Sequence, residues 1–244
     1  MTIWYEEAGT GDPVVLLHST AADSGMWDGV WQELTARHRV IRADFRGYGR
    51  TPLRADGPYS DSGDVADLMA ELGVERAALV GASGGGMAAL ELAAAGLATR
   101  LVLLNSLAPL TPTPDLRAFW DEENRLLEAG DVAGAAELNV RTLLGPDADD
   151  EARGRLLEMQ RHALEVQLAA HPGPEQIEHE IDLARIDVPA LVVSGVLDLA
   201  FFREGARHLA ATLPQARLVE LDWAGHLPAM ERPKEIAALL LDHL

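Results

Sequence analysis

A glycine-rich segment, Gly81-Ala82-Ser83-Gly84-Gly85-Gly86, has the residue types and spacing that hold a nucleophilic serine. It follows an apolar run and opens an alanine-rich stretch, so a strand, a sharp turn and a helix are predicted around Ser83. Small neighbours are needed because the serine of such a turn has a strained backbone that bulky residues do not tolerate. The composition gives roughly 0.06 accidental matches to G-x-S-x-G in a chain of this length. A phosphate-binding loop is disfavoured, since neither G-K-[ST] nor G-x-G-x-x-G is present.

His226 and Asp198 are the candidates for the base that activates Ser83 and for the acid that orients this base. His226 follows the last strand-like run of the chain, and Asp198 follows the run before it. The carboxyl ends of parallel strands meet along one edge of a sheet, where Ser83 is also predicted. Asp222 lies closer to His226 in sequence but belongs to the same strand end. Asp198 is therefore the better orienting acid.

An acyl-transfer site also needs backbone N–H groups that stabilise a negatively charged oxygen. Gly84, the residue after the serine, is expected to supply one of them at a helix N-terminus, where the helix dipole favours negative charge. The second donor is expected from the loop after the apolar run 14–17, and we assign it to Thr20. His18 in the same loop is interpreted as a residue that shapes the loop, not as a base.

The segments that must position these residues alternate between strand-like and helix-like patterns. Short apolar runs, several of them apolar on both faces, are typical of parallel strands covered by helices on each side. Pro233 falls where a helix would begin, a position at which its missing N–H costs nothing. The pattern predicts an α/β fold with an open, mostly parallel sheet. The strand-like runs are 14–17, 39–43, 77–80, 101–104, 190–193 and 216–221, and the helix-like stretches are 27–36, 60–72, 83–95, 202–213 and 233–243.

The region from 112 to 186 breaks this alternation because it contains no strand pattern. We therefore divide the chain into a core of residues 1–111 and 187–244 and an inserted, all-helical cap of residues 112–186. Such a cap would cover the carboxyl edge of the sheet, where α/β folds bind ligands. A helical ornament that only adds core is the alternative. Four helical runs, separated by Gly-Pro and Pro-Gly-Pro signals, are predicted over 116–129, 132–144, 150–170 and 175–183.

Composition excludes several classes of function. Of the 244 residues, 48% are hydrophobic, which is enough for a large buried core and excludes a disordered chain. The chain contains no cysteine, so disulfides, thiol nucleophiles and thiolate metal sites are excluded. A net charge of −19 disfavours nucleic acid and anionic membrane surfaces as partners. Without a membrane-length apolar run or a signal-like start, we expect a cytoplasmic protein that acts on a small molecule.

With these motifs in place, the chain resembles the α/β-hydrolase superfamily, in the branch of small cytoplasmic serine hydrolases with a helical cap. That branch includes carboxylesterases, lactonases, and cofactor-free haloperoxidases and perhydrolases. The order Ser83, Asp198, His226 is the triad order of the superfamily. Ser19 departs from the family, which has glycine after the histidine of the oxyanion loop. The matching segments are 16–18, 44–51, the turn around Ser83, 195–198 and 225–233.

The residue at the turn narrows the reaction that the resemblance implies. An aspartate there would indicate haloalkane dehalogenases or most epoxide hydrolases, whereas Ser83 indicates acyl transfer to water through an acyl-enzyme. The expected substrate is a carboxylic ester or lactone of small to medium apolar character. His226 would act as base and Asp198 would orient it, with no metal or organic cofactor. The alternative function is a ligand receptor, or a biosynthetic cyclase or isomerase, that keeps the triad; the oligomeric state stays open between monomer and homodimer.

Substrate contacts are expected from the predicted cap and from the loops beside the triad. Trp27 and Met230 flank the catalytic loops and are candidates for such contacts. An apolar stripe in and before the predicted cap is the other candidate, although packing inside the cap is an equally good interpretation of it. The stripe consists of Leu107, Leu110, Phe119, Trp120, Leu143 and Leu144.

Overall fold

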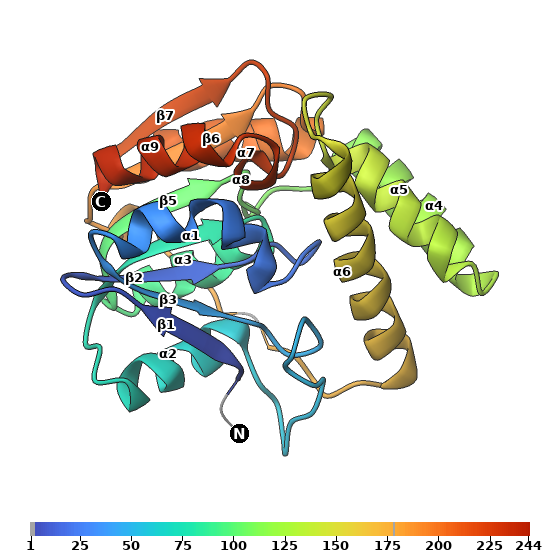
Figure 1. Ribbon diagram of the computed structural model, residues 1–244, viewed down its shortest axis with the longest axis horizontal. Coiled ribbons are helices and arrows are strands. Elements are labelled where there is room, and N and C mark those ends of the chain that lie inside the picture. Colours follow the sequence, from blue (N-terminus) through green and yellow to red (C-terminus); the bar gives the residue numbers. More distant parts are fainter. Residues whose placement is uncertain (1–2, 178) are drawn as a thin grey trace.

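A seven-stranded sheet runs through the centre of the protein (Figure 1). The computed structural model describes residues 3–177 and 179–244. The strands lie in the order β1-β3-β2-β4-β5-β6-β7, with β1 antiparallel to β3 and the other neighbouring pairs parallel. The predicted α/β class with a mostly parallel sheet is therefore confirmed. The strands are β1 (Tyr5–Ala8), β2 (Pro13–Leu17), β3 (Arg39–Ala43), β4 (Ala77–Ala82), β5 (Ala98–Leu104), β6 (Ala190–Gly195) and β7 (Ala216–Leu221).

Strand β1 is missing from the strands predicted by apolar runs, because its sequence is polar. It lies half-buried at the sheet edge and carries two carboxylates. Arginines of β3 pair with both: Arg39 Nε lies 2.5 Å from Glu7, and Arg42 Nη2 lies 2.6 Å from Glu6. Charged residues on an edge strand discourage pairing with other chains. Ion pairs between β1 and β3 therefore help to hold β1 in the sheet, although its sequence contains no apolar run.

Helices cover both faces of the sheet because alternate strand residues face opposite sides. One face, which includes Leu16 and Val80, packs against α1, α8 and α9. The opposite face, which includes Leu17 and Leu79, packs against α2, α3 and α7. Helix α9 begins at Pro233, as predicted. The bounds are α1 (Asp28–Thr35), α2 (Asp61–Glu71), α3 (Gly84–Ala94), α7 (Ala200–Thr212), α8 (Pro228–Glu231) and α9 (Pro233–His243), with 3-10 turns η1 (Ser24–Trp27) and η2 (Leu183–Arg185).

Three helices, called here the three-helix insertion, lie between β5 and β6 in the chain and beyond the carboxyl ends of the strands (Figure 1). Aspartates cap two of them: Asp131 accepts a hydrogen bond from Gly134 N, and Asp149 accepts one from Ala152 N, each at 2.8 Å. None of the helices in the described part of the chain is long and apolar enough to cross a membrane. The three helices, α4 (Pro114–Glu128), α5 (Val132–Leu143) and α6 (Asp150–Ala169), agree with the first three predicted runs.

The fourth predicted helical run, 175–183, is wrong. Residues 175–177 form an isolated parallel bridge with Tyr59, which lies just before α2, and Leu183 belongs to the 3-10 turn η2. Tyr59 N donates to Glu175 O at 3.0 Å, and Ile177 N donates to Tyr59 O at 2.7 Å. Backbone groups that find partners in a distant segment do not need the intrahelical bonds of a helix. Glu178, inside the predicted run, lies outside the described residues.

Candidate active site

Ser83 occupies a strained turn between β4 and α3. Its backbone has φ 52° and ψ −118°, and a positive φ is costly for a residue with a side chain. Close approach explains the flanking glycines: a Cβ on Gly81 would lie 2.3 Å from Gly85 O, and a Cβ on Gly85 would lie 2.4 Å from Leu17 O. The turn places Ser83 at the carboxyl end of β4, where it lines a cavity.

His226 and Asp198 form a buried pair beside the same cavity. His226 Nδ1 lies 2.7 Å from Asp198 Oδ2, and the two side chains are 2% and 0% exposed. Asp198 Oδ1 accepts a second hydrogen bond, from Leu199 N at 2.7 Å, which fixes the plane of the carboxylate. Because a carboxylate only accepts, Nδ1 carries the proton of this contact and Nε2 is left as the basic nitrogen. The carboxylate that contacts the ring is that of Asp198 and not that of Asp222.

Asn105 joins the loops that carry these two residues, and the sequence analysis gave it no role. It is fully buried after β5, with φ 43°. Its Nδ2 donates to the carbonyl oxygens of Gly225 and His226, both at 2.9 Å. Its Oδ1 accepts a hydrogen bond from Gly195 N at 2.7 Å, in the loop that leads to Asp198. One amide therefore fixes the relative position of both loops.

Glu231 holds the histidine loop through its N–H groups. Its Oε2 accepts from Gly225 N at 3.0 Å, and its Oε1 accepts from Leu227 N at 3.3 Å. The N–H of Gly145, between α5 and α6, is a third donor to this carboxylate. Burial raises the pKa of Glu231, and these three N–H groups oppose that shift. The matching segment 225–233 contains Glu231, but the residue pattern alone did not assign this contact.

The loop after β2 lies over the first turn of α3. A Cβ on Gly84 would come within 2.6 Å of Thr20 Cγ2, so the two residues predicted to stabilise an oxyanion are in direct contact. Thr20 lines the cavity together with Ser83. Ser19, which stands where the family has glycine, is buried, and its Oγ accepts a hydrogen bond from Ala21 N at 3.0 Å. The Ser19 hydroxyl therefore stabilises the turn by accepting this backbone hydrogen bond.

His18 fixes the start of this loop and has no free ring nitrogen. Nδ1 donates to Ser19 O at 2.8 Å, and Nε2 accepts from Phe45 N at 2.9 Å. The ring also packs on Phe45 and Tyr48, with centroid separations of 4.4 and 5.3 Å. Burial lowers the pKa of His18, so the imidazole stays neutral. The geometry agrees with a loop-shaping role for His18.

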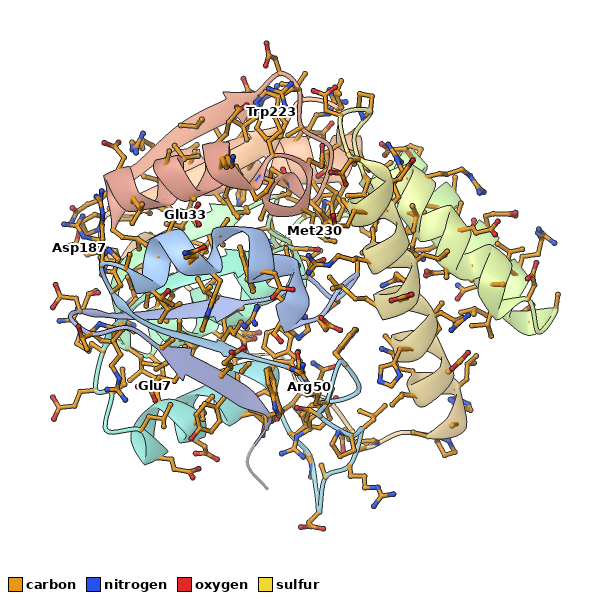
Figure 2. All side chains as sticks on the ribbon, viewed as in Figure 1. Glu7, Glu33, Arg50, Asp187, Trp223 and Met230 are labelled. Carbon is orange, nitrogen blue, oxygen red and sulfur yellow. The ribbon has the colours of Figure 1, made fainter. Side chains whose placement is uncertain are left out.

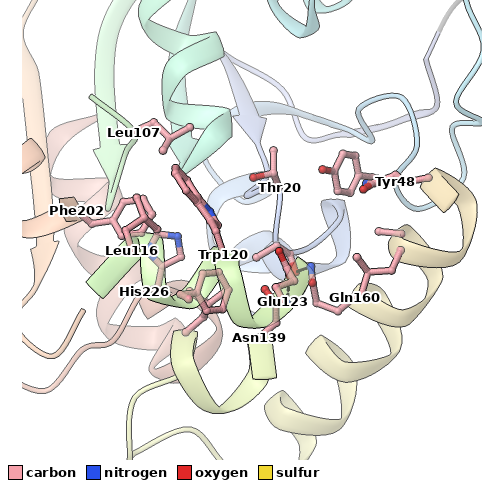
Figure 3. A pocket seen from close by; sticks show the side chains of 17 residues that line it. Thr20, Tyr48, Leu107, Leu116, Trp120, Glu123, Asn139, Gln160, Phe202 and His226 are labelled. Atoms are coloured by element: carbon pink, nitrogen blue, oxygen red, sulfur yellow. Dashed lines mark hydrogen bonds between the residues drawn. The ribbon is translucent and has the colours of Figure 1, made fainter. Parts of the chain in front are cut away.

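A cavity of about 260 Å³ opens beside Ser83 and His226 (Figure 3). Four large apolar residues of its wall are predicted from the sequence, whereas Leu116, Leu164 and Phe202 are not. Phe202 also packs against the ring of His226, with a centroid separation of 4.1 Å. Its position at the start of α7, close after Asp198 in sequence, was the available signal. The large apolar residues of the wall are Leu107, Leu116, Phe119, Trp120, Leu143, Leu164 and Phe202, with Ala21 and Ala163 beside them.

Trp27 and Met230 do not line this cavity, which corrects the prediction for both. Trp27 is fully buried in the core between the sheet and α1. Met230 lies on α8 (Figure 2). It packs against the same core and lines a separate cavity. Leu110 and Leu144 do not line the cavity either: Leu144 packs in the core, and Leu110 packs against the cluster of Leu116 and Phe202. Closeness in sequence to a catalytic loop does not determine the direction of a side chain.

Polar side chains form another part of the cavity wall. On α6, Gln160, Ala163, Leu164 and Gln167 have the spacing of one helix face, which was a usable signal. Burial raises the pKa of Tyr48, so its phenol stays neutral. Across residues 3–177 and 179–244, no three His, Asp or Glu side chains gather as metal ligands would. The polar wall consists of Tyr48, Glu123, Asn139, Gln160 and Gln167 (Figure 3).

Sequence similarity to known proteins decides the family. A model of the alpha/beta hydrolase family matches residues 14–239, a range that contains Ser83, Asp198 and His226. The chain belongs to the alpha/beta hydrolase family. The predicted superfamily, and with it the class of hydrolase enzymes, is confirmed.

Similar members of the family cover almost the whole of this α/β hydrolase. RutD of Pseudomonas savastanoi pv. phaseolicola, provisionally named a carbamate hydrolase, is 30% identical over 247 residues, which are 95% of this chain and 93% of that protein. A pimeloyl-[acyl-carrier protein] methyl ester esterase of Aeromonas salmonicida is 27% identical and covers 98% of each chain. The enol-lactonase structure from Burkholderia xenovorans LB400 has a TM-score of 0.78 at 27% identity, covering 99% of this chain and 95% of the other.

Proposed function

We propose that this α/β hydrolase is a serine hydrolase that cleaves a carboxylic ester or lactone through an acyl-enzyme on Ser83. The observation that carries the proposal is the 2.7 Å contact between His226 Nδ1 and Asp198 Oδ2 at a cavity that Ser83 also lines. The names of the esterase and the lactonase among the similar proteins support ester bonds as the target.

In the proposed mechanism, His226 Nε2 takes the proton of the Ser83 hydroxyl as its oxygen attacks the carbonyl carbon. Asp198 holds Nδ1–H and stabilises the imidazolium that forms. The N–H groups of Gly84 and Thr20 would stabilise the tetrahedral oxyanion, with the dipole of α3 adding to the first. His226 then gives its proton to the leaving alcohol, and water repeats these steps on the acyl-enzyme. With a lactone, the alcohol stays attached to the released acid.

The cavity also bears on the size and character of the substrate. Its volume of about 260 Å³ suits a small to medium acyl group, and its apolar wall favours a hydrocarbon portion. Helices α4, α5 and α6 supply ten of the lining residues. We therefore also propose that the three-helix insertion acts as the cap of the active site and sets its selectivity.

A fluorophosphonate probe tests the nucleophile, because its adduct mimics the tetrahedral intermediate. We expect a single adduct on Ser83, found by peptide mapping, and none on the Ser83→Ala protein. Asp198→Asn should slow labelling strongly because it favours the wrong imidazole tautomer; the same change in a serine protease triad lowers the rate by about 10⁴-fold. Asp222→Asn is the matched control and should label at the wild-type rate.

Three results would contradict the proposal. An adduct on Ser106 or Ser194 would remove Ser83 from its role. Equal labelling rates for Asp198→Asn and Asp222→Asn would remove the orienting acid. Tight binding of esters with only one slow turnover would favour the ligand-receptor alternative, so steady-state methanol release from methyl heptanoate is measured in parallel.

A further inference from the structure

Glu123 brings a carboxylate to the cavity wall, and the proposed mechanism does not use it. It projects from α4 into the cavity that also contains Ser83 and His226 (Figure 3). Asn139 Nδ2 donates to Glu123 Oε1, and in the described part of the chain no other hydrogen bond reaches this carboxylate. Its second oxygen is therefore left for a ligand.

Among residues 3–177 and 179–244, no Lys or Arg compensates the charge of Glu123. Among the described residues that line the cavity there is no Lys or Arg, and the other titratable groups are His226 and Tyr48. Its neighbour Glu122 is different, because it is exposed and pairs with Arg125 at 2.8 Å. Burial raises the pKa of Glu123, against the opposing effect of the Asn139 hydrogen bond. The Glu123 carboxylate is therefore partly removed from water and has no positively charged partner among the described lining residues.

The neighbours of Glu123 indicate which kind of cation would fit. A site for Mg²⁺ or Ca²⁺ gathers several oxygen ligands around the ion, usually with more than one carboxylate, whereas Glu123 is the one carboxylate among the described lining residues. Asn139 Nδ2 also donates to Ala135 O, and Gln160 Nε2 donates to Ala21 O. Their amide oxygens are therefore the groups left to accept hydrogen bonds. One carboxylate with two amide oxygens matches the three N–H donors of an ammonium group.

We propose that Glu123 recognises a protonated amine on the substrate, so that the enzyme prefers amino-substituted esters or lactones to neutral ones of the same shape. The inference rests on the proposed ester-hydrolase function and adds a substrate class to it. Ser83 and the apolar wall would take the acyl carbon and its hydrocarbon stem, while the amine would reach Glu123 on α4. A carboxylate that is partly removed from water is unfavourable without a partner, and the bound ammonium supplies that partner.

Matched methyl esters test the proposal. Methyl ω-aminoalkanoates of three to six carbons are each compared with the ester in which a methyl group replaces the ammonium, so that methyl 6-aminohexanoate is paired with methyl heptanoate. We expect the wild-type enzyme to have a kcat/KM at least about tenfold higher for the best ammonium ester than for its partner, as hydrogen bonds to charged groups are the strong ones. This ratio should grow as the pH rises through the raised pKa of Glu123, because only the ionised carboxylate pairs with the ammonium group.

Glu123→Gln separates recognition from structure, because glutamine still accepts a hydrogen bond from Asn139 but carries no charge. It should bring the ratio of the two kcat/KM values close to one, through a larger loss for methyl 6-aminohexanoate than for methyl heptanoate. Glu122→Gln, the exposed neighbour, should leave the ratio unchanged.

Equal loss of both esters in Glu123→Gln would assign Glu123 a structural role and overturn the inference. Equal kcat/KM values in the wild type would also overturn it. If neither ester turned over, the proposed hydrolase function would fail. Binding of methyl 6-aminohexanoate and methyl heptanoate to the Ser83→Ala protein, measured by calorimetry, would then still decide whether Glu123 selects the amine.

Discussion

Asn105 and Glu231 hold the backbone that presents His226, although neither side chain reaches the reacting atoms. Asn105 binds the carbonyl oxygens of Gly225 and His226, and Glu231 binds the N–H groups of Gly225 and Leu227. Acceptors and donors of one short loop are thus satisfied by two fixed side chains. Small displacements of catalytic groups cost large factors in rate. Both residues therefore act by positioning the imidazole.

Asn105→Ala should lower the stability and kcat together. It leaves the buried Gly195 N–H and two carbonyl groups without partners, at about 1–3 kcal/mol for each unsatisfied group. It also places alanine at φ 43°, a further cost of roughly 1 kcal/mol. Urea denaturation measures the first effect, and methyl heptanoate hydrolysis measures the second.

Asn105→Gly is the matched variant, because it removes the same amide without the cost of a positive φ. We expect it to be more stable than the alanine variant and to share its low kcat, with KM within about twofold of wild type. A glycine variant with wild-type kcat would mean that the amide does not position His226.

The placement of Ser83, His226 and Asp198 at one edge of the sheet could be predicted from sequence, whereas the contacts of Asn105 could not. Ser83 lies in a turn whose glycines are close to it in the chain. The need for small residues around Ser83 is therefore visible in one short segment of sequence. The contacts of Asn105 span 90 to 121 residues, and its surroundings in sequence carry no trace of them. Trp27 shows the reverse error: it is close to a catalytic loop, but its side chain points into the core.

At the scale of elements, the connection between α5 and α6 of the three-helix insertion contacts the loop that contains His226. His226 N donates to Leu143 O at 2.7 Å, and Gly145 N donates to the carboxylate of Glu231. A Cβ on Gly225 would lie 2.5 Å from Gly145 N, so the two segments touch backbone to backbone. Displacement of the insertion would therefore also displace the imidazole.

Gly225→Ala should weaken both stability and catalysis, because the added methyl group meets backbone atoms that cannot rotate away. Overpacking of this kind costs about 1–3 kcal/mol. Gly154→Ala is the control within the same insertion: Gly154 is exposed in α6, and a Cβ there has nothing within 4 Å. That change should raise the free energy of unfolding by roughly 0.5–1 kcal/mol and leave kcat unchanged. A Gly225→Ala protein with wild-type melting temperature and kcat would contradict the predicted contact.

Local signals account for the elements that were predicted. Helices α5 and α6 begin after aspartates that cap their first turns, and these signals lie within four residues of each helix start. The run 175–183 has a helical composition, but its backbone pairs with Tyr59, which is more than a hundred residues away. Local periodicity contains no information on such a partner. Strand β1 escaped prediction for a related reason, because arginines of β3 stabilise it.

At the scale of the whole molecule, the dominant feature is a net charge of −19 from 39 acidic and 20 basic residues. Several arginines are already paired, such as Arg42 with Glu6 and Asp28. The acidic side chain of Asp187 lies at the outer edge of the protein (Figure 2). A surface with this imbalance attracts cations and repels anions before any contact forms. The long-range field and the carboxylate of Glu123 therefore favour the same sign of substrate.

Salt separates these two contributions, since it screens the field over long distances more than it weakens a buried contact. The Debye length falls from about 30 Å at 0.01 M salt to about 8 Å at 0.15 M. Over this range, kcat/KM should rise several-fold for anionic methyl hydrogen adipate, fall for methyl 6-aminohexanoate and stay constant for methyl heptanoate. Glu123→Gln should keep these three slopes, because it removes one of 39 acidic residues, but it should lose the preference for the amine that persists at 0.15 M. Parallel salt dependences for the three esters would show that the charge of −19 does not reach the active site.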